Sequence, residues 1–162
     1  MKLETNDNWR LGVRRMLEIE EGAFTVPYDD KTGQRLHATG NVTIGCGRNT
    51  DAKPLKPDEI IYLLDNDIDD AVEDCKAVLG EFVYRSLGEI HQYAVLNIAF
   101  NLGRSRFASF KQLREALHAR DFRQAAAEVL DSLWAKQLPA RAKRVADMFL
   151  TEEYPPFYVY GK

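Results

Sequence analysis

The stretch that decides the fold is residues 21–47, which read EGAFTVPYDDKTGQRLHATGNVTIGCG. Glu21 stands at the end of an amphipathic helix predicted from about residue 10 to residue 21, and Gly22 ends that helix. Nine residues after Glu21, Asp30 begins the turn of a β segment that contains several glycines. The sequence thus places two carboxylates on different elements, where they can face each other across a gap.

The patterns on either side of this stretch predict the other elements. Turn residues around Val42-Thr43-Ile44 indicate a small antiparallel sheet within residues 28–47. Helical periodicity predicts a long helix over 57–79 that starts at Pro57, and further helices over 86–102, 109–119, 121–134 and 139–149. Ser86 with Glu89 has the spacing of a capping box, and Asp121 suits an N-cap.

The order of these elements predicts an α+β fold that is mainly α. We expect residues 1–162 to form one domain with two lobes. A β-containing lobe covers about 22–56, the helix over 57–79 connects the lobes, and residues 10–21 and 80–162 build the helical lobe. The aromatic segment 154–160 is predicted to fold back on the core.

Composition is that of a soluble globular protein. The chain has 162 residues, a net charge of −3 and 45% apolar residues, enough to bury one core. The polar stretch 1–10 lacks the apolar run of a signal peptide, and no run is long enough to span a bilayer. Cys46 and Cys75 lack metal or disulfide spacing, so both are expected to be reduced and buried. No metal or cofactor is expected.

Glu20 and Glu21 have different environments on the first helix. Glu20 lies on its apolar face and needs a cationic partner, which Arg141 or Arg144 can supply. Glu21 lies at the edge of that face, where the helix end and apolar neighbours favour a carboxylic acid over a carboxylate. Such an acid can donate a proton to a leaving oxygen.

Other motifs near these acids give weaker signals. Thr43 can place a hydroxyl inward beside both acids, and Gly45 and Gly47 suit a close approach of backbone or ligand. The acidic run 65–70 does not match a calcium-binding loop, because Asp70 and Lys76 stand where Gly and Glu are needed. Residues 45–50 lack the third glycine of a dinucleotide-binding motif, and the three histidines have no catalytic spacing.

Taken together, the residues 21–47 and later segments resemble the phage-type lysozymes, the endolysins of glycoside hydrolase family 24. The resemblance rests on Glu21-Gly22, Tyr28, Asp30, Gly33 and the segments 43–47, 99–103, 132–134 and 137–145. They occur in the same order as in the family and cover the chain from about Met16 to Phe149. The resemblance implies that Glu21 is the general acid, Asp30 the second carboxylate and Thr43 the residue that positions a water molecule.

The family likeness also implies an inverting mechanism, which requires about 6.5–9.5 Å between the two carboxyl groups. Phe100 and Asn101 match family positions that line the cleft, where they would contact the sugars; core packing and helix termination are the alternative roles. In place of the usual histidine the chain has Arg48, which we expect to pair with Asp67. The segment 34–42, which includes His37, is longer than in the family's shortest versions.

These observations predict an enzyme that hydrolyses the β-1,4 bond between N-acetylmuramic acid and N-acetylglucosamine in bacterial peptidoglycan. A wall-binding protein with little catalysis, such as a phage structural component or an effector, is the alternative, and a transglycosylase is a third. The resemblance implies a monomer that waits in the host cytoplasm until a holin-like pore admits it to the wall. Nucleic acid and stable membrane insertion are not expected.

Overall fold

The computed structural model describes residues 7–28 and 42–156, and its first element is the helix that ends in the two glutamates. Helix α1 spans Asp7–Glu21, and its buried apolar side chains are Trp9, Val13, Met16 and Leu17. Gly22 ends the helix with a φ of 78°, a left-handed conformation that glycine adopts without steric cost. The predicted helix is therefore confirmed, with an additional turn at its start.

The sheet is one short antiparallel hairpin. Strand β1 (Thr43–Ile44) pairs with β2 (Arg48–Asn49), and Thr43 lies opposite Asn49. Gly45 and Gly47 have φ values of 56° and 78° in the connecting turn, which explains both glycines. Cys46 stands between them and is exposed, so the prediction that it is buried is wrong, whereas Cys75 is buried as expected. A two-residue strand has no inner face that could cover the thiol.

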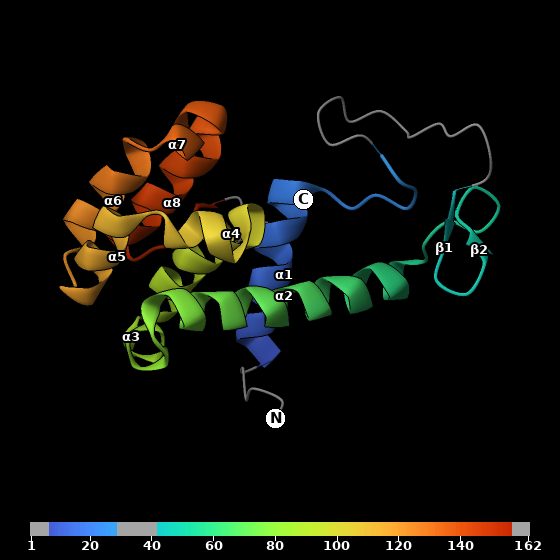
Figure 1. Ribbon diagram of the computed structural model, residues 1–162, viewed down its shortest axis with the longest axis horizontal. Coiled ribbons are helices and arrows are strands. Elements are labelled where there is room, and N and C mark those ends of the chain that lie inside the picture. Colours follow the sequence, from blue (N-terminus) through green and yellow to red (C-terminus); the bar gives the residue numbers. More distant parts are fainter. Residues whose placement is uncertain (1–6, 29–41, 157–162) are drawn as a thin grey trace.

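The long helix has the predicted limits. Helix α2 spans Pro57–Leu79 and begins with proline, whose missing N–H is not needed in the first turn. Its buried residues start only at Ile68, so its N-terminal half projects from the packed helices and carries the hairpin (Figure 1). Arg14 on α1 forms two hydrogen bonds to Asp65 on α2, of 2.5 and 2.6 Å. This pair ties the two helices where α2 leaves the core.

The hairpin is held to α2 by a different ion pair from the one predicted. Arg48 pairs with Glu59 in the first turn of α2 and donates to the carbonyl oxygens of Lys53 and Pro54. The predicted ion pair between Arg48 and Asp67 is therefore wrong. Eight residues of helix, about 12 Å along its axis, separate Glu59 from Asp67, which is too far for one side chain to reach both.

The region after α2 differs from the prediction at the helix ends. A short helix, α3 (Glu81–Ser86), was not predicted, and α4 spans Glu89–Ala108. Ser86 does not cap α4, because Gly88 occupies the N-cap and the Ser86 hydroxyl donates to the Val83 carbonyl within α3. Gly103, predicted to end the helix, has non-helical φ and ψ of 71° and 167°, so the regular helix is interrupted there as predicted, and a second helical stretch continues beyond this kink to Ala108.

The remaining helices complete the helical lobe. They are α5 (Lys111–His118), α6 (Phe122–Leu130), α7 (Leu133–Gln137) and α8 (Pro139–Thr151). Asp121 caps α6 as predicted, accepting from the Gln124 amide at 2.9 Å. The predicted helix over 121–134 is however two helices, because the Ser132 hydroxyl accepts from the Ala135 amide and starts α7.

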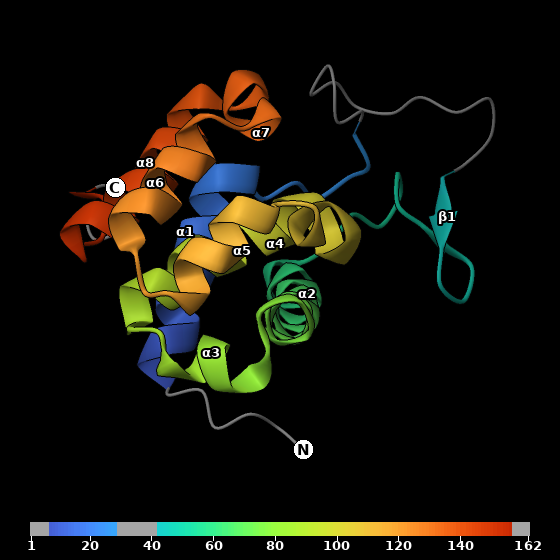
Figure 2. The same cartoon turned by 60° about the vertical axis from the view of Figure 1, so that its left-hand side comes forward.

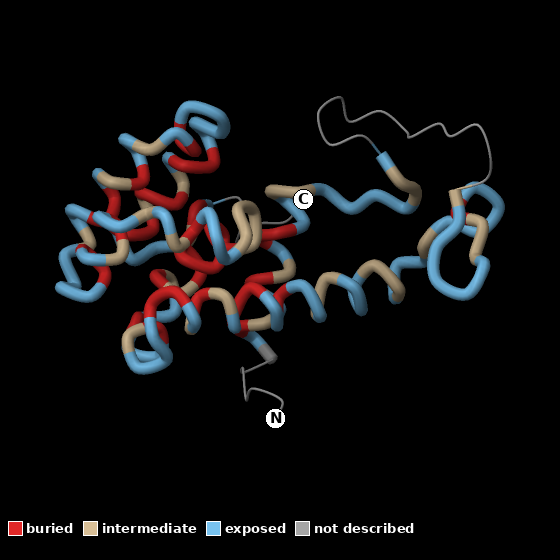
Figure 3. Tube along the Cα trace, in the orientation of Figure 1, coloured by how far each residue is buried: buried red, intermediate tan, exposed pale blue. Residues whose placement is uncertain are grey.

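The core lies among α1, the C-terminal half of α2, α5, α6 and α8, with α4 in the middle. Two views show α4 surrounded by the other helices and the hairpin at the far end of α2 (Figures 1 and 2). Buried residues concentrate in this helical part, and the N-terminal half of α2 is largely exposed (Figure 3). The fold is thus α+β and mainly α, as predicted. No helix in the described ranges is long and apolar enough to cross a membrane.

The described part of the aromatic tail packs on this lobe. The Tyr154 ring lies 5.0 Å from the Tyr93 ring, and its hydroxyl donates to Glu89. Pro155 is buried. Residues 154–156 therefore follow the prediction that the tail folds back, while 157–160 lie outside the described residues.

Candidate active site

Glu21 lies where the end of α1 meets α4 and α8. Its Oε1 atom accepts a hydrogen bond from Arg141 Nη1 at 2.6 Å and one from Asn101 Nδ2 at 3.4 Å. Its side chain is 34% exposed, so the carboxyl group remains accessible to a ligand. Within the described residues Oε2 accepts no hydrogen bond, which leaves that oxygen open to a ligand.

Asn101 is fixed by two protein groups. Its Nδ2 donates to Glu21, and its Oδ1 accepts from the indole Nε1 of Trp134 at 2.9 Å. One bond at each end of the amide fixes its plane, so the side chain helps to orient Glu21. The predicted bond from Asn101 to a sugar stays a prediction.

Arg141 contacts Glu21 from α8. It lies in the first turn of α8, is almost completely buried and donates through Nε to Asn97 Oδ1 at 2.6 Å. The sequence suggested Arg141 as a partner for Glu20, and its Nε does form an ion pair with Glu20 Oε2 at 3.9 Å, but its shorter bond is the one from Nη1 to Glu21. The basic run 141–144 predicts a cation here, but it gives no local signal that Arg141 is the residue that bonds Glu21.

Glu20 is held by Arg144, one of its two predicted partners. Arg144 donates to both carboxylate oxygens, with Nε to Oε1 at 2.8 Å, and the Glu20 side chain is only 3% exposed. A buried carboxylate needs such a two-bond partner to compensate for lost hydration. Glu20 thus locks the end of α1 onto α8 and leaves the neighbouring Glu21 at the surface.

The other predicted site residues lie apart from this cluster. Thr43 is exposed on β1, in the hairpin at the N-terminal end of α2 (Figures 1 and 2). Asp30 and His37 lie outside the described residues, as do most of the predicted β segment and the segment 34–41. The separation of about 6.5–9.5 Å between the two carboxyl groups stays a prediction. The described structure therefore brings together Glu21, Asn101 and Arg141, and does not bring Thr43 to them.

Phe100 lies between the hydrophobic core and a small surface pocket. One part of its side chain packs against the core, and another borders a pocket of about 270 Å³ between α2 and α4. Asp67 also lines this pocket, where partial burial and then repulsion from Asp70 raise the pKa of its carboxyl group. Both predicted roles of Phe100, core packing and a cleft wall, are compatible with this position.

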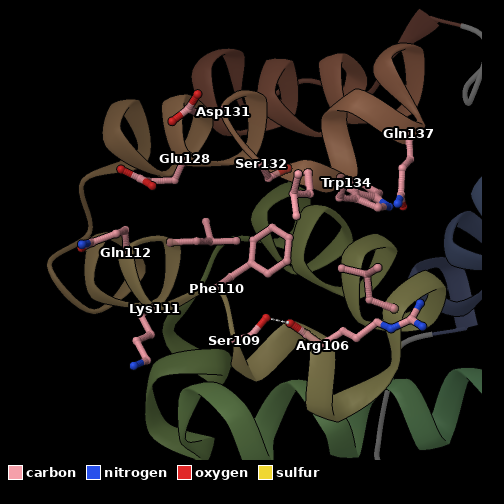
Figure 4. A pocket seen from close by; sticks show the side chains of 13 residues that line it. Arg106, Ser109, Phe110, Lys111, Gln112, Glu128, Asp131, Ser132, Trp134 and Gln137 are labelled. Atoms are coloured by element: carbon pink, nitrogen blue, oxygen red, sulfur yellow. Dashed lines mark hydrogen bonds between the residues drawn. The ribbon is translucent and has the colours of Figure 1, made fainter.

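A larger pocket of about 630 Å³ adjoins the Glu21 cluster through Trp134. It lies between the end of α4, α5 and the α6–α7 junction, with Phe110 among the side chains that line it (Figure 4). Lys111 and Arg106 contribute positive charge, and Glu128 and Asp131 contribute negative charge. Trp134 lines this pocket and also bonds Asn101, which in turn bonds Glu21. The Trp134 side chain therefore connects the pocket to the Glu21 cluster. The sequence patterns do not predict this pocket, because its walls come from two stretches of the chain, 102–113 and 128–137, that only the fold brings together.

No group of three or more metal-ligating side chains occurs within 7–28 and 42–156. Carboxylate, amide and guanidinium groups converge at Glu21 instead. This arrangement holds a carboxyl group in one orientation at an accessible surface, as proton transfer to or from a bound ligand requires.

Comparisons with known proteins add independent information on this chain. The Phage lysozyme family model matches residues 18–147. The pre-baseplate central spike protein Gp5 of Enterobacteria phage T4 is 26% identical over 170 residues, which cover 93% of this chain and 29% of that protein. The probable T4-type lysozymes 1 and 2 of Dictyostelium discoideum are 29% and 30% identical over 69 residues, 43% of this chain and 41% of theirs. The chain thus matches less than half the length of each relative.

Proposed function

We propose, from the premise that this chain belongs to the phage lysozyme family, that it hydrolyses the glycan of bacterial peptidoglycan. The bond is the β-1,4 linkage between N-acetylmuramic acid and N-acetylglucosamine, and the reaction is inverting. The observation that carries the proposal is the Glu21 carboxyl group, held through Oε1 by Arg141 and Asn101 and accessible to ligand.

In this mechanism Glu21 is the general acid. Two donors on Oε1 leave the proton to Oε2, which delivers it to the glycosidic oxygen as the bond to the sugar carbon breaks. Asp30 takes a proton from a water molecule that attacks the anomeric carbon from the opposite face, and Thr43 orients that water. For this step the hairpin that carries Thr43 must approach Glu21 when the glycan binds.

The larger pocket beside Trp134 suits a substrate that carries more than sugars. Peptidoglycan bears peptides with carboxylate and amine groups, and the pocket presents both Lys111 and Glu128. A peptide bound there would orient the glycan at Glu21, because Trp134 connects the pocket to the Glu21 cluster.

The proposal also covers how the protein reaches its substrate. It acts as a monomer, is released from the host cytoplasm through a holin-like pore, and then reaches the cell wall.

The test compares Glu21→Gln with Glu18→Gln on purified peptidoglycan. Glu18 lies one turn earlier on α1 and is exposed, so it controls for the loss of a charge from this helix. We expect Glu21→Gln to lose about 10²–10⁴-fold in the rate of release of reducing ends, and Glu18→Gln to keep the wild-type rate. Equal rates for all three proteins would remove Glu21 from the mechanism.

The products separate the alternatives. A hydrolase adds water and releases reducing sugars, whereas a transglycosylase forms anhydro sugars; the anomer observed first by NMR reports inversion or retention. The second candidate is a wall-binding module of a phage particle, which the similarity to the T4 spike protein favours. It predicts that wild type and Glu21→Gln bind peptidoglycan equally and that neither cleaves it.

A further inference from the structure

Asn97 is a polar side chain at the most apolar point of the helical lobe. It is completely buried in α4, and its neighbours Ala94, Val95, Leu96, Ile98 and Ala99 are buried too. Such a buried amide destabilises a core unless it forms hydrogen bonds. Two of its bonds are formed with Arg141, through the side-chain Oδ1 at 2.6 Å and the main-chain carbonyl at 3.4 Å.

These two bonds fix the direction of the third Arg141 nitrogen. The Asn97 oxygens accept from Nε and Nη2, and Nη1 donates to Glu21 Oε1. Because the guanidinium group is planar and rigid, holding two of its nitrogens determines where the third one points. The position of Arg141 Nη1, the donor to Glu21, is therefore set by Asn97, which acts on Glu21 through Arg141.

We propose that Asn97 is a positioning residue for the reaction, acting on Glu21 through Arg141. This inference rests on the proposed function of Glu21 as the acid. Asn97 and Asn101 lie one turn apart on the same face of α4. Asn101 orients Glu21 directly with the support of Trp134, and Asn97 orients it through Arg141. The two amides thereby fix the plane of one carboxyl group and keep Oε2 turned to the ligand.

The first experiment compares Asn97→Ala with Val95→Ala on soluble peptidoglycan fragments. Val95 is equally buried on α4, and its apolar side chain makes no hydrogen bond, so it controls for a loss of core packing. We expect Asn97→Ala to lower kcat about tenfold or more, because small displacements of a catalytic group have large effects on rate. Its KM should stay within about twofold of wild type. Val95→Ala should keep the wild-type kcat at a temperature where circular dichroism shows it folded.

A double mutant tests the route through Arg141. If Asn97 acts only by holding Arg141, adding Asn97→Ala to Arg141→Ala leaves kcat unchanged, whereas independent effects multiply. Arg141→Lys serves as the background if Arg141→Ala does not fold. Asn97→Asp keeps an acceptor oxygen for Nε, and we expect it to restore kcat to within about threefold of wild type.

The outcomes distinguish this inference from the proposed function. An active Glu21→Gln variant would refute the function of Glu21 itself. If Glu21→Gln is inactive while folded Asn97→Ala keeps the wild-type kcat and KM, only the role of Asn97 is refuted. Multiplicative effects of Asn97→Ala and Arg141→Ala would refute the route through Arg141.

Discussion

Arg141 joins the start of α8 to the end of α1 by a hydrogen bond of 2.6 Å to Glu21, across 120 residues of sequence. One turn further along α8, Arg144 holds Glu20, the residue before Glu21. The last two residues of α1 are thus each bonded by a different arginine of α8. Glu20, which has a two-bond partner, is buried and supports the fold. Glu21 stays accessible and is available for chemistry.

The Glu20–Arg144 pair is expected to contribute strongly to stability. Arg144→Ala removes the two-bond partner of a carboxylate that is 3% exposed, and the contact to Arg141 that remains is longer, at 3.9 Å. We expect the free energy of unfolding to fall by about 3 kcal/mol, since removing one partner of a buried ion pair leaves an uncompensated charge. Urea unfolding followed by circular dichroism measures this change.

The neighbouring Lys143 provides the matched control. It pairs with Asp147 on the exposed face of the same helix, where both side chains are largely in solvent. Lys143→Ala should change the free energy of unfolding by about 0.5 kcal/mol or less. Similar losses in the two variants would contradict the distinction between a buried and an exposed pair.

The burial of His91 predicts that the free energy of unfolding depends on pH. Its ring is buried and stacks 3.7 Å from the Phe122 ring, and this burial lowers the pKa of the imidazole below its ordinary value of 6.5. Glu152 and a hydrogen bond to the Phe149 backbone act in the opposite direction, and Arg120 adds to the lowering. Below about pH 6.5 the unfolded chain therefore binds a proton that the folded chain does not bind.

The free energy of unfolding should consequently decrease as pH falls from 7.5 to 5. Urea midpoints at several pH values measure it, with His91→Phe as the comparison because an aromatic ring fits the stack and does not titrate. The variant should lose less stability over this range than wild type. Identical pH dependence in the two proteins would show that His91 does not titrate differently on folding.

The two thiols are expected to react very differently. Cys46 is exposed in the hairpin turn, whereas Cys75 is buried in α2, where desolvation raises the pKa of its thiol far above the ordinary range. A thiol reagent such as dithionitrobenzoate should modify one cysteine per native chain and both in denaturant. Cys46→Ser should abolish the native reaction. Two fast-reacting thiols in the native wild type would contradict the placement of Cys75.

Local pattern was sufficient for much of the fold. The limits of α2 follow from Pro57 and an apolar stripe, both of which are visible within one segment. Helix ends were predicted less well where two residues close together can each cap or end a helix. Ser86 has capping-box spacing to Glu89, but the intervening Gly88 starts α4, and Ser132 divides a continuous apolar pattern into α6 and α7.

For the candidate site, the sequence by itself determined which residue types meet at the end of α1. A carboxylate on the apolar face of a helix requires a cation, and the basic residues 141–144 were the evident source. Only the tertiary structure decided that Arg144 takes Glu20, that Arg141 takes Glu21, and that Arg48 bonds Glu59 instead of Asp67. The support from Asn97 and Trp134 was likewise decided by packing. Periodicity fixes the face on which a side chain lies, whereas the pairing of charges depends on distances between helices that are far apart in the chain.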